Sequence, residues 1–538
     1  MSSSTMNDQY DYVVVGAGSA GCVLANRLST DPNIRVCLIE AGPPDSHPYI
    51  QVPLGIAALL DHPVLNWNFS SIPQQNAGNR TIAVPRGKTL GGSSSINGMV
   101  YTRGHPTDYD DWSDLGNEGW SFEEVLPYFR RSENNRDFRD SPYHGTSGPV
   151  EVGFLDSYNP LVETFFQAGE GLGYQRNPDF CGLTHEGFGR RQASIARGRR
   201  VSAATAYLRP ALPRRNLTVL TGTLVRRVVI EGARATAVEV EAEGGQYRAI
   251  RARREVVLSA GAIGSPHLLM LSGIGDADEL RAHGIAVRRH LPGVGRNLQD
   301  HLCATIQYSS PTTIPYGLSW RSFPWLAWNF LSYPFTRKGL LANNVLHASA
   351  FIRSLPDLRR PDVQIILVPA VHDKKSGRMG IGHGFGLMTS LMRPRSRGRI
   401  SLASADPRQA PVIDFNFLSA PEDIETLSRG ARISRRIAES TPFDKVRGAE
   451  LEPNPGTWSG SELAEYIRQY SHTGYHPVGT CAMGQGEDAV VDAQLRVHGI
   501  EKLRVVDASI MPTLIGGNTG GPVMMIGEKA ADMILAAA

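Results

Sequence analysis

The chain has 538 residues, 41% of them hydrophobic and 20% charged, so it is too apolar to be disordered and too long for one simple core. Its 55 basic and 52 acidic residues nearly cancel, which gives no support to a nucleic-acid partner. Five scattered cysteines favour a reducing compartment over a disulfide framework. No apolar run reaches the roughly 20 residues that span a bilayer. We therefore expect a cytoplasmic protein of two domains.

The first elements along the chain predict a βαβ unit. Residues 11–15 form a short apolar run that is typical of a buried strand. Residues 19–29 follow with apolar side chains near one face of a helix, and residues 35–42 predict a second buried strand after a turn. A strand, a helix and a parallel strand in this order are the opening of a dinucleotide-binding fold.

A glycine motif joins the first strand to the helix. Gly16 permits the tight turn, Gly18 lets the backbone approach a pyrophosphate, and Gly21 lets helix and strand pack closely. Glu40 ends the second strand, where a carboxylate accepts hydrogen bonds from ribose hydroxyls. The motif alone does not distinguish NAD from FAD. The predicted contacts in this segment are Gly16, Gly18, Ser19, Ala20, Gly21, Glu40 and Ala41.

The remaining elements alternate between long loops, a sheet region and helices. Residues 43–110 are rich in Pro, Gly, Asn and Ser, which predicts ordered loops. Alternation over residues 218–258 predicts a small antiparallel sheet that leads into another buried strand. Further elements are expected at 363–370 (strand), 421–440 (helix), 503–509 (strand) and 522–538 (helix).

Two longer segments identify a family resemblance. Residues 87-GKTLGGSSSINGMVY-101 and 261-GAIGSPHLLMLSGIG-275 match the two signatures of the glucose–methanol–choline (GMC) oxidoreductases at every constrained position. Similar stretches occur in family order at 202–211, 292–301, 475–484 and 505–522. The chain therefore resembles this family over nearly its whole length, and most closely its bacterial choline-dehydrogenase-like and aliphatic alcohol dehydrogenase branch.

The resemblance implies FAD and an α/β fold, α+β overall. A Rossmann-like FAD-binding domain would be interleaved with a substrate domain built on an antiparallel sheet with helices. The FAD-binding domain would comprise 8–155, with a flavin loop at 85–105, then 200–300 and 466–538. The substrate domain would comprise 156–199 and 301–465.

The flavin loop leaves its backbone bare. Gly91, Gly92 and the serines 93–95 allow a flat ring to lie against the chain, and Asn97 can bond the ring or hold the loop. Where some relatives attach FAD through a histidine, this chain has Ile96, so the resemblance implies non-covalent FAD. The flavin contacts that it implies are Gly91, Gly92, Ser93, Asn97, Gly98, Val100, Val225, Asp507, Ala508, Asn518 and Thr519.

The resemblance also implies a catalytic pair. His476 precedes Pro, Val, Gly and Thr, the setting of the family's flavin-facing histidine, and Asn518 stands at the second position, which is His or Asn in relatives. Hydride leaves an alcohol carbon only when the hydroxyl proton is accepted, and a neutral imidazole can accept it. An amide can stabilise the developing alkoxide. His472 is expected to be structural, and we expect no metal site.

The expected reaction is oxidation of a primary alcohol to the aldehyde, with electrons passed to a quinone or another organic acceptor. An oxidase that uses oxygen and releases hydrogen peroxide is the alternative, and a non-redox hydroxynitrile lyase is a third. The alcohol itself, whether aliphatic, aromatic or choline, stays open.

One aromatic segment has no place in this scheme. Residues 316–335 contain eight aromatic residues, followed by Arg337 and Lys338. They predict either a lid or wall of the substrate domain or a patch that rests on a membrane surface. The second reading would give a cytoplasmic protein with optional peripheral contact to the inner membrane.

Overall fold

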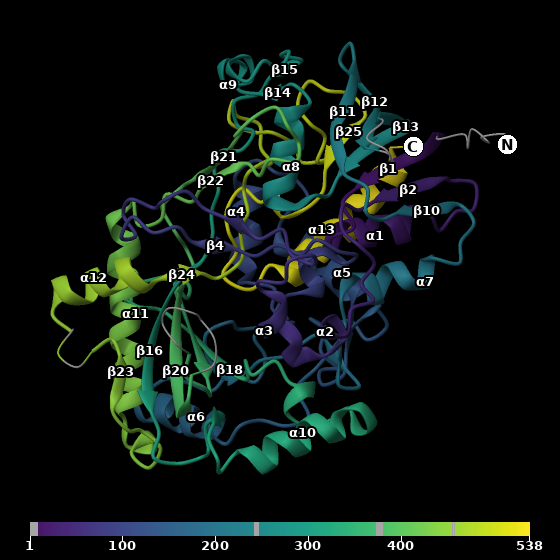
Figure 1. Cartoon of the computed structure of the whole chain (residues 1–538). Helices are drawn as coiled ribbons and strands as arrows, with labels where there is room; N and C mark the ends of the chain where they lie inside the picture. Colours follow the sequence, from purple (N-terminus) through teal and green to yellow (C-terminus); the bar gives the residue numbers. More distant parts are fainter. Residues whose placement is uncertain (1–8, 242–246, 373–379, 455, 457, 538) are drawn as a thin grey trace.

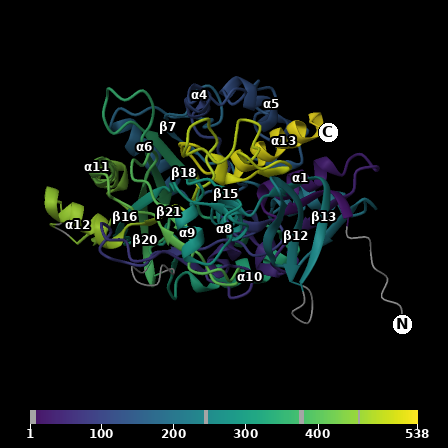
Figure 2. The same ribbon diagram turned by 90° about the horizontal axis from the view of Figure 1, so that it is seen from above.

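The computed structural model describes residues 9–241, 247–372, 380–454, 456 and 458–537. Two sheets dominate it, one at the upper right of Figure 1 and the other at the lower left. Figure 2, seen from above, separates the same two sheets from right to left. The predicted mixed α/β architecture is confirmed.

The first sheet has seven strands among the described residues. It combines a parallel part, whose short runs are almost wholly buried as parallel strands usually are, with an antiparallel extension. In sheet order the strands are β10 (Leu217–Leu220), β2 (Val36–Ile39), β1 (Gln9–Val15), β13 (Tyr247–Leu258), β12 (Arg234–Glu241) and β11 (Val225–Glu231), with β25 (Leu503–Val505) joined to β13.

Strand β13 belongs to both parts of this sheet. Its first half pairs with β12 in antiparallel fashion, and its last three residues, 256–258, pair in parallel with β25. This confirms an antiparallel sheet that leads into a buried strand. The expectation is wrong for β10, because that strand pairs in parallel with β2 at the opposite edge. Alternating polarity marks a half-exposed strand but does not name its partner.

Three helices join the two ends of the chain on this sheet: α1 (Ser19–Leu28), α5 (Phe122–Ser132) and α13 (Gly520–Ala536). Glu528 of α13 is fully buried, and its carboxylate pairs with Arg27 of α1 at 2.7 Å and with Arg131 of α5 at 2.8 Å. A Cβ atom on Gly527 would lie 3.0 Å from Val23 of α1, so the helices touch there. The C-terminal helix therefore completes a unit that the N-terminal βαβ segment begins.

The second sheet is antiparallel and has eight strands among the described residues. Helix α11 (Pro421–Glu439) packs on one face, where Thr389 bonds Ser434 at 2.7 Å. Side chains alternate, so Ile306 faces this core while Gln307 faces the other side. In order the strands are β23 (Glu450–Glu452), β16 (Leu302–Ser309), β20 (Gly382–Leu391), β19 (Val363–Val368), β18 (Ala348–Ile352) and β7 (Gly187–Arg190), with β17 (Gly317–Leu318) on β20 and β24 (His472–Thr473) on β16.

Shorter elements connect the two sheets, and loops occupy most of residues 43–110, as expected. None of the described helices is long and apolar enough to cross a membrane. The other helices are α2 (Pro48–Gln51), α3 (Ile56–Leu59), α4 (Pro106–Asp114), α6 (Leu161–Gly171), α7 (Arg209–Ala211), α8 (Gly261–Leu271), α9 (Ala277–Ala282), α10 (Phe323–Thr336) and α12 (Gly460–Tyr470). The small strand pairs are β3 (Phe69–Ser70) with β4 (Ala83–Val84), β5 (Glu133–Asn135) with β6 (Val150–Val152), β8 (Ile195–Ala196) with β9 (Arg199–Arg200), β14 (Ile274–Gly275) with β15 (Arg289–His290), and β21 (Arg399–Ser401) with β22 (Val412–Asp414).

Candidate active site

A central cavity of about 1060 Å³ is lined by residues of both sheets. Residues just beyond the carboxyl ends of the parallel strands β1, β2, β13 and β25 form part of its wall. They are Gly16, Glu40, Ser259 and Asp507. Ligands of open α/β sheets bind at this carboxyl edge. The opposite wall is the free face of the second sheet, so a single cavity lies between the dinucleotide edge and that sheet.

The glycine motif has the geometry that its sequence predicts. Gly16 has φ +97°, and a Cβ atom there would lie 2.5 Å from the Ser259 carbonyl oxygen. A Cβ atom on Gly21 would lie 1.9 Å from the Gly16 oxygen, so Gly21 packs behind the wall and does not line the cavity. Gly18, Ser19 and Ala20 line it.

The amino end of α1 and the Glu40 carboxylate suit a dinucleotide. Helix α1 begins without a side-chain cap and without an acidic residue in its first turn, so its free N–H groups can bind phosphate. Glu40 accepts hydrogen bonds from the N–H groups of Ala17 and Gly42, both at 2.9 Å, and burial raises its pKa to about 7. Ala41 and Val225 line the cavity beside it.

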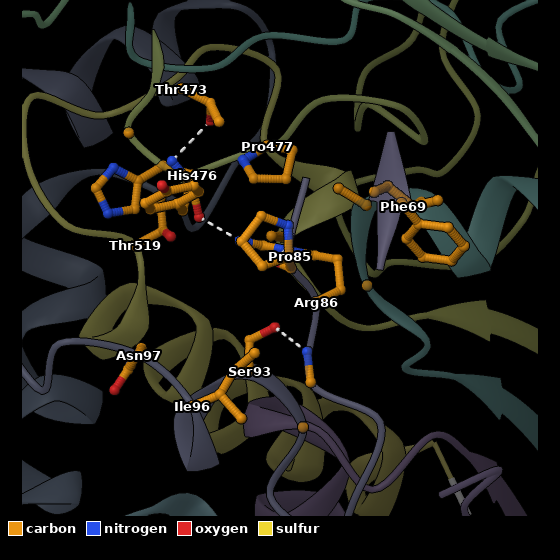
Figure 3. Close-up of a pocket in the computed structure, with 18 of the residues that line it drawn as sticks. Phe69, Pro85, Arg86, Ser93, Ile96, Asn97, Thr473, His476, Pro477 and Thr519 are labelled. Atoms are coloured by element: carbon orange, nitrogen blue, oxygen red, sulfur yellow. Dashed lines mark hydrogen bonds between the residues drawn. The ribbon is translucent and has the colours of Figure 1, made fainter. Parts of the chain in front are cut away.

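The flavin loop forms a second wall. A short 3-10 turn, Gly92–Ser95, follows Gly91, which has φ +86° and lies behind the surface of the cavity. Gly92, Ser93, Asn97, Gly98 and Val100 line the cavity. The Asn97 side-chain oxygen accepts from the Met99 N–H at 3.0 Å and from Arg200 at 2.9 Å, so this oxygen holds the loop. Figure 3 shows Ser93, Ile96 and Asn97 across the cavity from His476.

The third wall comes from the C-terminal segment. Asp507 accepts hydrogen bonds from the Gly261 N–H at 2.9 Å and from the Ser265 hydroxyl at 2.6 Å, so its carboxylate anchors the start of α8. Ala508 and Thr519 line the cavity next to it. Helix α13 begins after Thr519, again without a side-chain cap or an acidic first turn. The loop, the strand ends and two open helix ends therefore fit FAD.

The two predicted catalytic side chains meet in the cavity. His476 Nε2 lies 3.1 Å from Asn518 Nδ2, and both residues line the cavity. The other ring nitrogen of His476, Nδ1, lies 2.9 Å from Nδ1 of His301, whose Nε2 lies 3.1 Å from the carbonyl oxygen of Ile515. His301 is the last residue of the family-like stretch 292–301, for which the sequence indicated no role.

These contacts fix the tautomer of His476. A carbonyl oxygen only accepts, so His301 donates from Nε2 and, while neutral, has a lone pair on Nδ1. His476 must then donate from its own Nδ1, which leaves the lone pair on Nε2. The amide of Asn518 donates to that lone pair. Nε2 of His476 is therefore an unprotonated nitrogen that faces the cavity.

Burial and neighbouring positive charges keep His476 neutral. Its pKa lies well below the ordinary value of 6.5, first because burial disfavours the imidazolium and then because His301, Arg86 and Arg191 repel it. Burial likewise lowers the pKa of His301 to about 4. Both rings are neutral at neutral pH, which is the form that a general base needs.

The backbone around His476 is held tightly. Its N–H donates to Asp300 at 2.7 Å, and Thr473 bonds the other oxygen of that carboxylate. Tyr475 has the left-handed φ of +67°, a strained conformation for a bulky residue, and Arg86 donates to its carbonyl oxygen at 2.7 Å. Figure 3 shows Arg86, Thr473 and Pro477 around the histidine. These contacts fix the direction of the imidazole ring.

The face of the second sheet that lines the cavity is uncharged over β16, β19 and β20 but carries the Glu452 carboxylate on β23. Its strands β16, β19 and β20 contribute the lining residues Cys303, Thr305, Gln307, Gln364, Ile366, Val368, Met388 and Ser390. In the described part of the chain, no group of three His, Cys, Asp or Glu side chains is arranged to hold a metal ion. The arrangement suits a small substrate between a base and a flat cofactor.

Comparison with known proteins assigns the chain to a family. The N-terminal and C-terminal GMC oxidoreductase family models match residues 10–303 and 394–527. An alcohol dehydrogenase (acceptor) of Pseudomonas putida is 45% identical over 527 residues, 98% of this chain and 96% of the relative. An oxygen-dependent choline dehydrogenase of Rhizobium etli is 44% identical over 530 residues, with 98% and 96% covered. A formate oxidase of Aspergillus oryzae has a TM-score of 0.92 at 28% identity and 99% coverage of both chains. The chain therefore belongs to the GMC oxidoreductases, and it is an FAD-binding oxidoreductase.

Proposed function

We propose that this flavoenzyme oxidises a primary alcohol to the aldehyde, with His476 as the base and Asn518 as its partner. The observation that carries the proposal is the unprotonated Nε2 of His476, fixed by His301 on one side and paired with the Asn518 amide at 3.1 Å on the other. A base with a lone pair that faces a cofactor cavity is what removal of a hydroxyl proton needs.

The reaction divides between the protein and its cofactor. FAD, when bound, accepts the hydride of the carbinol carbon. An alcohol between the two side chains would replace the Asn518 hydrogen bond at His476 Nε2, whose lone pair would then accept the hydroxyl proton. The alcohol thereby loses one proton and one hydride and becomes the aldehyde. Asn518 Nδ2 carries two hydrogens and can donate to the alcohol oxygen as negative charge develops on it.

The uncharged part of the sheet face, over β16, β19 and β20, supports an uncharged alcohol. A choline pocket would require a carboxylate and aromatic rings around the ammonium group. The β16, β19 and β20 side chains that face the cavity carry hydroxyl, thiol, amide, thioether or aliphatic groups. A primary alcohol with an apolar chain complements this part of the wall. Choline is the alternative, because Glu452, Tyr466 and Tyr470 also line the cavity and because of the relatives named above.

The electron acceptor is proposed to be quinone-like, reached at a membrane surface. Helix α10 extends along the bottom edge of Figure 1, and most of its aromatic side chains are exposed, among them Phe335 at 89%. Of the described residues between 316 and 335, none lines the cavity, so the segment is not a cavity wall. Helix α10 is flanked by Arg321 on one side and by Arg337 and Lys338 on the other, and residues 316–338 contain no acidic residue. Exposed aromatics beside basic groups suit an anionic bilayer surface.

An oxidase is the second candidate, supported by the oxygen-dependent and oxidase relatives; a lyase is a distant third. The test of the proposed reaction is anaerobic mixing of the yellow protein with a panel of primary alcohols that includes choline. We expect an aliphatic alcohol to bleach the flavin band with formation of the aldehyde. If no alcohol bleaches it, the proposed reaction is wrong and a non-redox role gains support.

A further inference from the structure

One cation of the cavity wall has no use in the reaction as described so far. Arg191 directly follows β7, and its backbone N–H donates to the carbonyl oxygen of His347 at 2.9 Å. Its side chain is 2% exposed, and no acidic side chain among the described residues pairs with it. Burial lowers its pKa to about 9, so it is still protonated at neutral pH. A buried charge without a counter-ion is costly and is rarely kept without a function.

The contacts of Arg191 point to Asn518. Its Nη2 donates to Asn518 Oδ1 at 2.9 Å, while Nε and Nη1 are buried and have no acceptor in the described part of the chain. A guanidinium only donates, so it must face the oxygen end of the amide. The Asn518 amide therefore directs Nδ2 toward His476. The two ends of an amide are hard to distinguish by shape, and Arg191 is what decides between them.

We propose that Arg191 is a positioning residue of the active site, which fixes the direction of the Asn518 amide and places a positive charge behind the catalytic pair. The inference rests on the proposed function. The charge opposes protonation of His476, as its effect on the pKa of that ring indicates, and it favours negative charge on the alcohol oxygen. A carboxylate ligand is the other use of a buried guanidinium, but Nε and Nη1 are sealed from the cavity.

The experiment compares Arg191→Met with Arg191→Lys. Methionine removes the charge and the donors at similar length, so we expect flavin reduction to slow by roughly 10²-fold. The acidic limb of its pH profile should move to higher pH, because one of the cations that lower the pKa of His476 is gone. Lysine keeps the charge but not the planar fork, so its acidic limb should stay near that of the unchanged protein while the rate falls less.

Arg190→Met is the matched control. The Arg190 side chain lies over the rings of Phe154 and Tyr158, at 5.2 and 5.3 Å from their centroids. The Arg190→Met substitution therefore removes a cation one residue away without touching Asn518. It should retain the rate and the acidic limb. An unmoved acidic limb and an unchanged rate in Arg191→Met would overturn the proposal. So would competitive inhibition by acetate that is lost in Arg191→Met, because Arg191 would then bind ligand directly. An unchanged protein that no alcohol bleaches would instead reject the proposed function.

Discussion

The proposed chemistry depends on the imidazole of His476. Substitution of His476 by alanine removes the nitrogen that accepts the hydroxyl proton but leaves the strand ends and the flavin loop untouched. We expect His476→Ala to retain FAD and to lose flavin reduction by roughly 10²–10⁴-fold, the usual contribution of general acid–base catalysis. Rapid-mixing absorbance at the flavin band measures the rate. Near-normal reduction in this variant would exclude His476 as the base.

The pH profile is the control for that assignment. The reactive form of His476 is neutral, and its pKa lies well below 6.5. Flavin reduction in the unchanged protein should therefore be constant near neutral pH and fall only as the pH drops through that lowered pKa. The residual rate of His476→Ala should not show this acidic limb, and the same limb in both proteins would assign it to another group.

Asn518 gives a second test at the residue scale. In Asn518→Asp an anion would stand beside the developing alkoxide and oppose it, whereas the ring of Asn518→His can still donate a hydrogen bond. The carboxylate would also face Arg191 and thereby neutralise a charge that the site otherwise keeps. We expect Asn518→Asp to slow flavin reduction more than Asn518→His does. Equal rates in single-turnover mixing would remove the amide from the mechanism.

The place of His476 and Asn518 in the cavity was predictable because their local motifs are specific, but their surroundings were not. His476 and Asn518 each stand in a short pattern with a recognised setting. His301 contacts His476, which is 175 positions away in the chain, and Arg191 contacts Asn518, which is 327 positions away. Such contacts depend on how β16 and β7 are placed beside the C-terminal segment, and a periodic pattern does not encode that placement.

At the scale of elements, the flavin loop carries the prediction on cofactor attachment. Ile96 is 3% exposed, packs with Ile50, Leu59 and Leu65, and has no nucleophilic atom that could bond the flavin. We expect acid precipitation of the protein to leave all FAD intact in the supernatant. Flavin absorbance that stays with the washed pellet would show a covalent link through another side chain.

Helix α10 carries the membrane prediction. Replacing its exposed Trp328 and Phe335 with serine removes apolar area that a bilayer would bury at roughly 1.5–3 kcal/mol per side chain. We expect the double variant to partition at least about tenfold less onto vesicles that contain anionic lipid. Its flavin reduction by alcohol should not change, because α10 does not line the cavity. Vesicle co-sedimentation measures the partition.

A matched surface variant controls for general loss of apolar area. Leu115 and Leu183 are exposed at 55% and 77% but lie outside α10, so Leu115→Ser with Leu183→Ser should bind vesicles as the unchanged protein does. Equal binding by the α10 variant would contradict a membrane surface there. Sequence composition raised this possibility, but only the structure distinguishes an exposed patch from a cavity wall, since both are aromatic.

Element boundaries followed well from periodicity and caps, and pairing did not. The helix expected at 421–440 spans Pro421–Glu439, where proline occupies the first turn and apolar residues recur along one face. The antiparallel sheet expected over 218–258 wrongly included β10, because the few residues of this strand suit either part of the sheet. Its true position beside β2 extends the parallel sheet to which the dinucleotide edge belongs.

At the scale of the molecule, the interleaving of the two units explains how the cavity is closed. The first sheet takes strands from the beginning, middle and end of the chain, and β24 of the C-terminal segment pairs with β16 of the second sheet. His476 comes shortly after β24, so the proposed catalytic histidine stands where the two sheets are joined. The proposed domain ranges place this junction just inside the FAD-binding unit. That unit would comprise 8–155, 200–300 and 466–538, and the substrate domain would comprise 156–199 and 301–465.

The destination of the electrons is also a property of the whole molecule. A flavoprotein that rests on a bilayer through α10 could deliver electrons to a membrane quinone, and this gives the exposed aromatic patch a purpose. We expect fast turnover of the purified protein with a soluble quinone or a phenazine dye and slow formation of hydrogen peroxide in air. An oxygen electrode and a dye assay on the same sample, with the same alcohol, compare the two rates directly. Oxygen consumption that matches dye turnover would establish the oxidase alternative, and α10 would then need a partner other than a membrane that holds quinone.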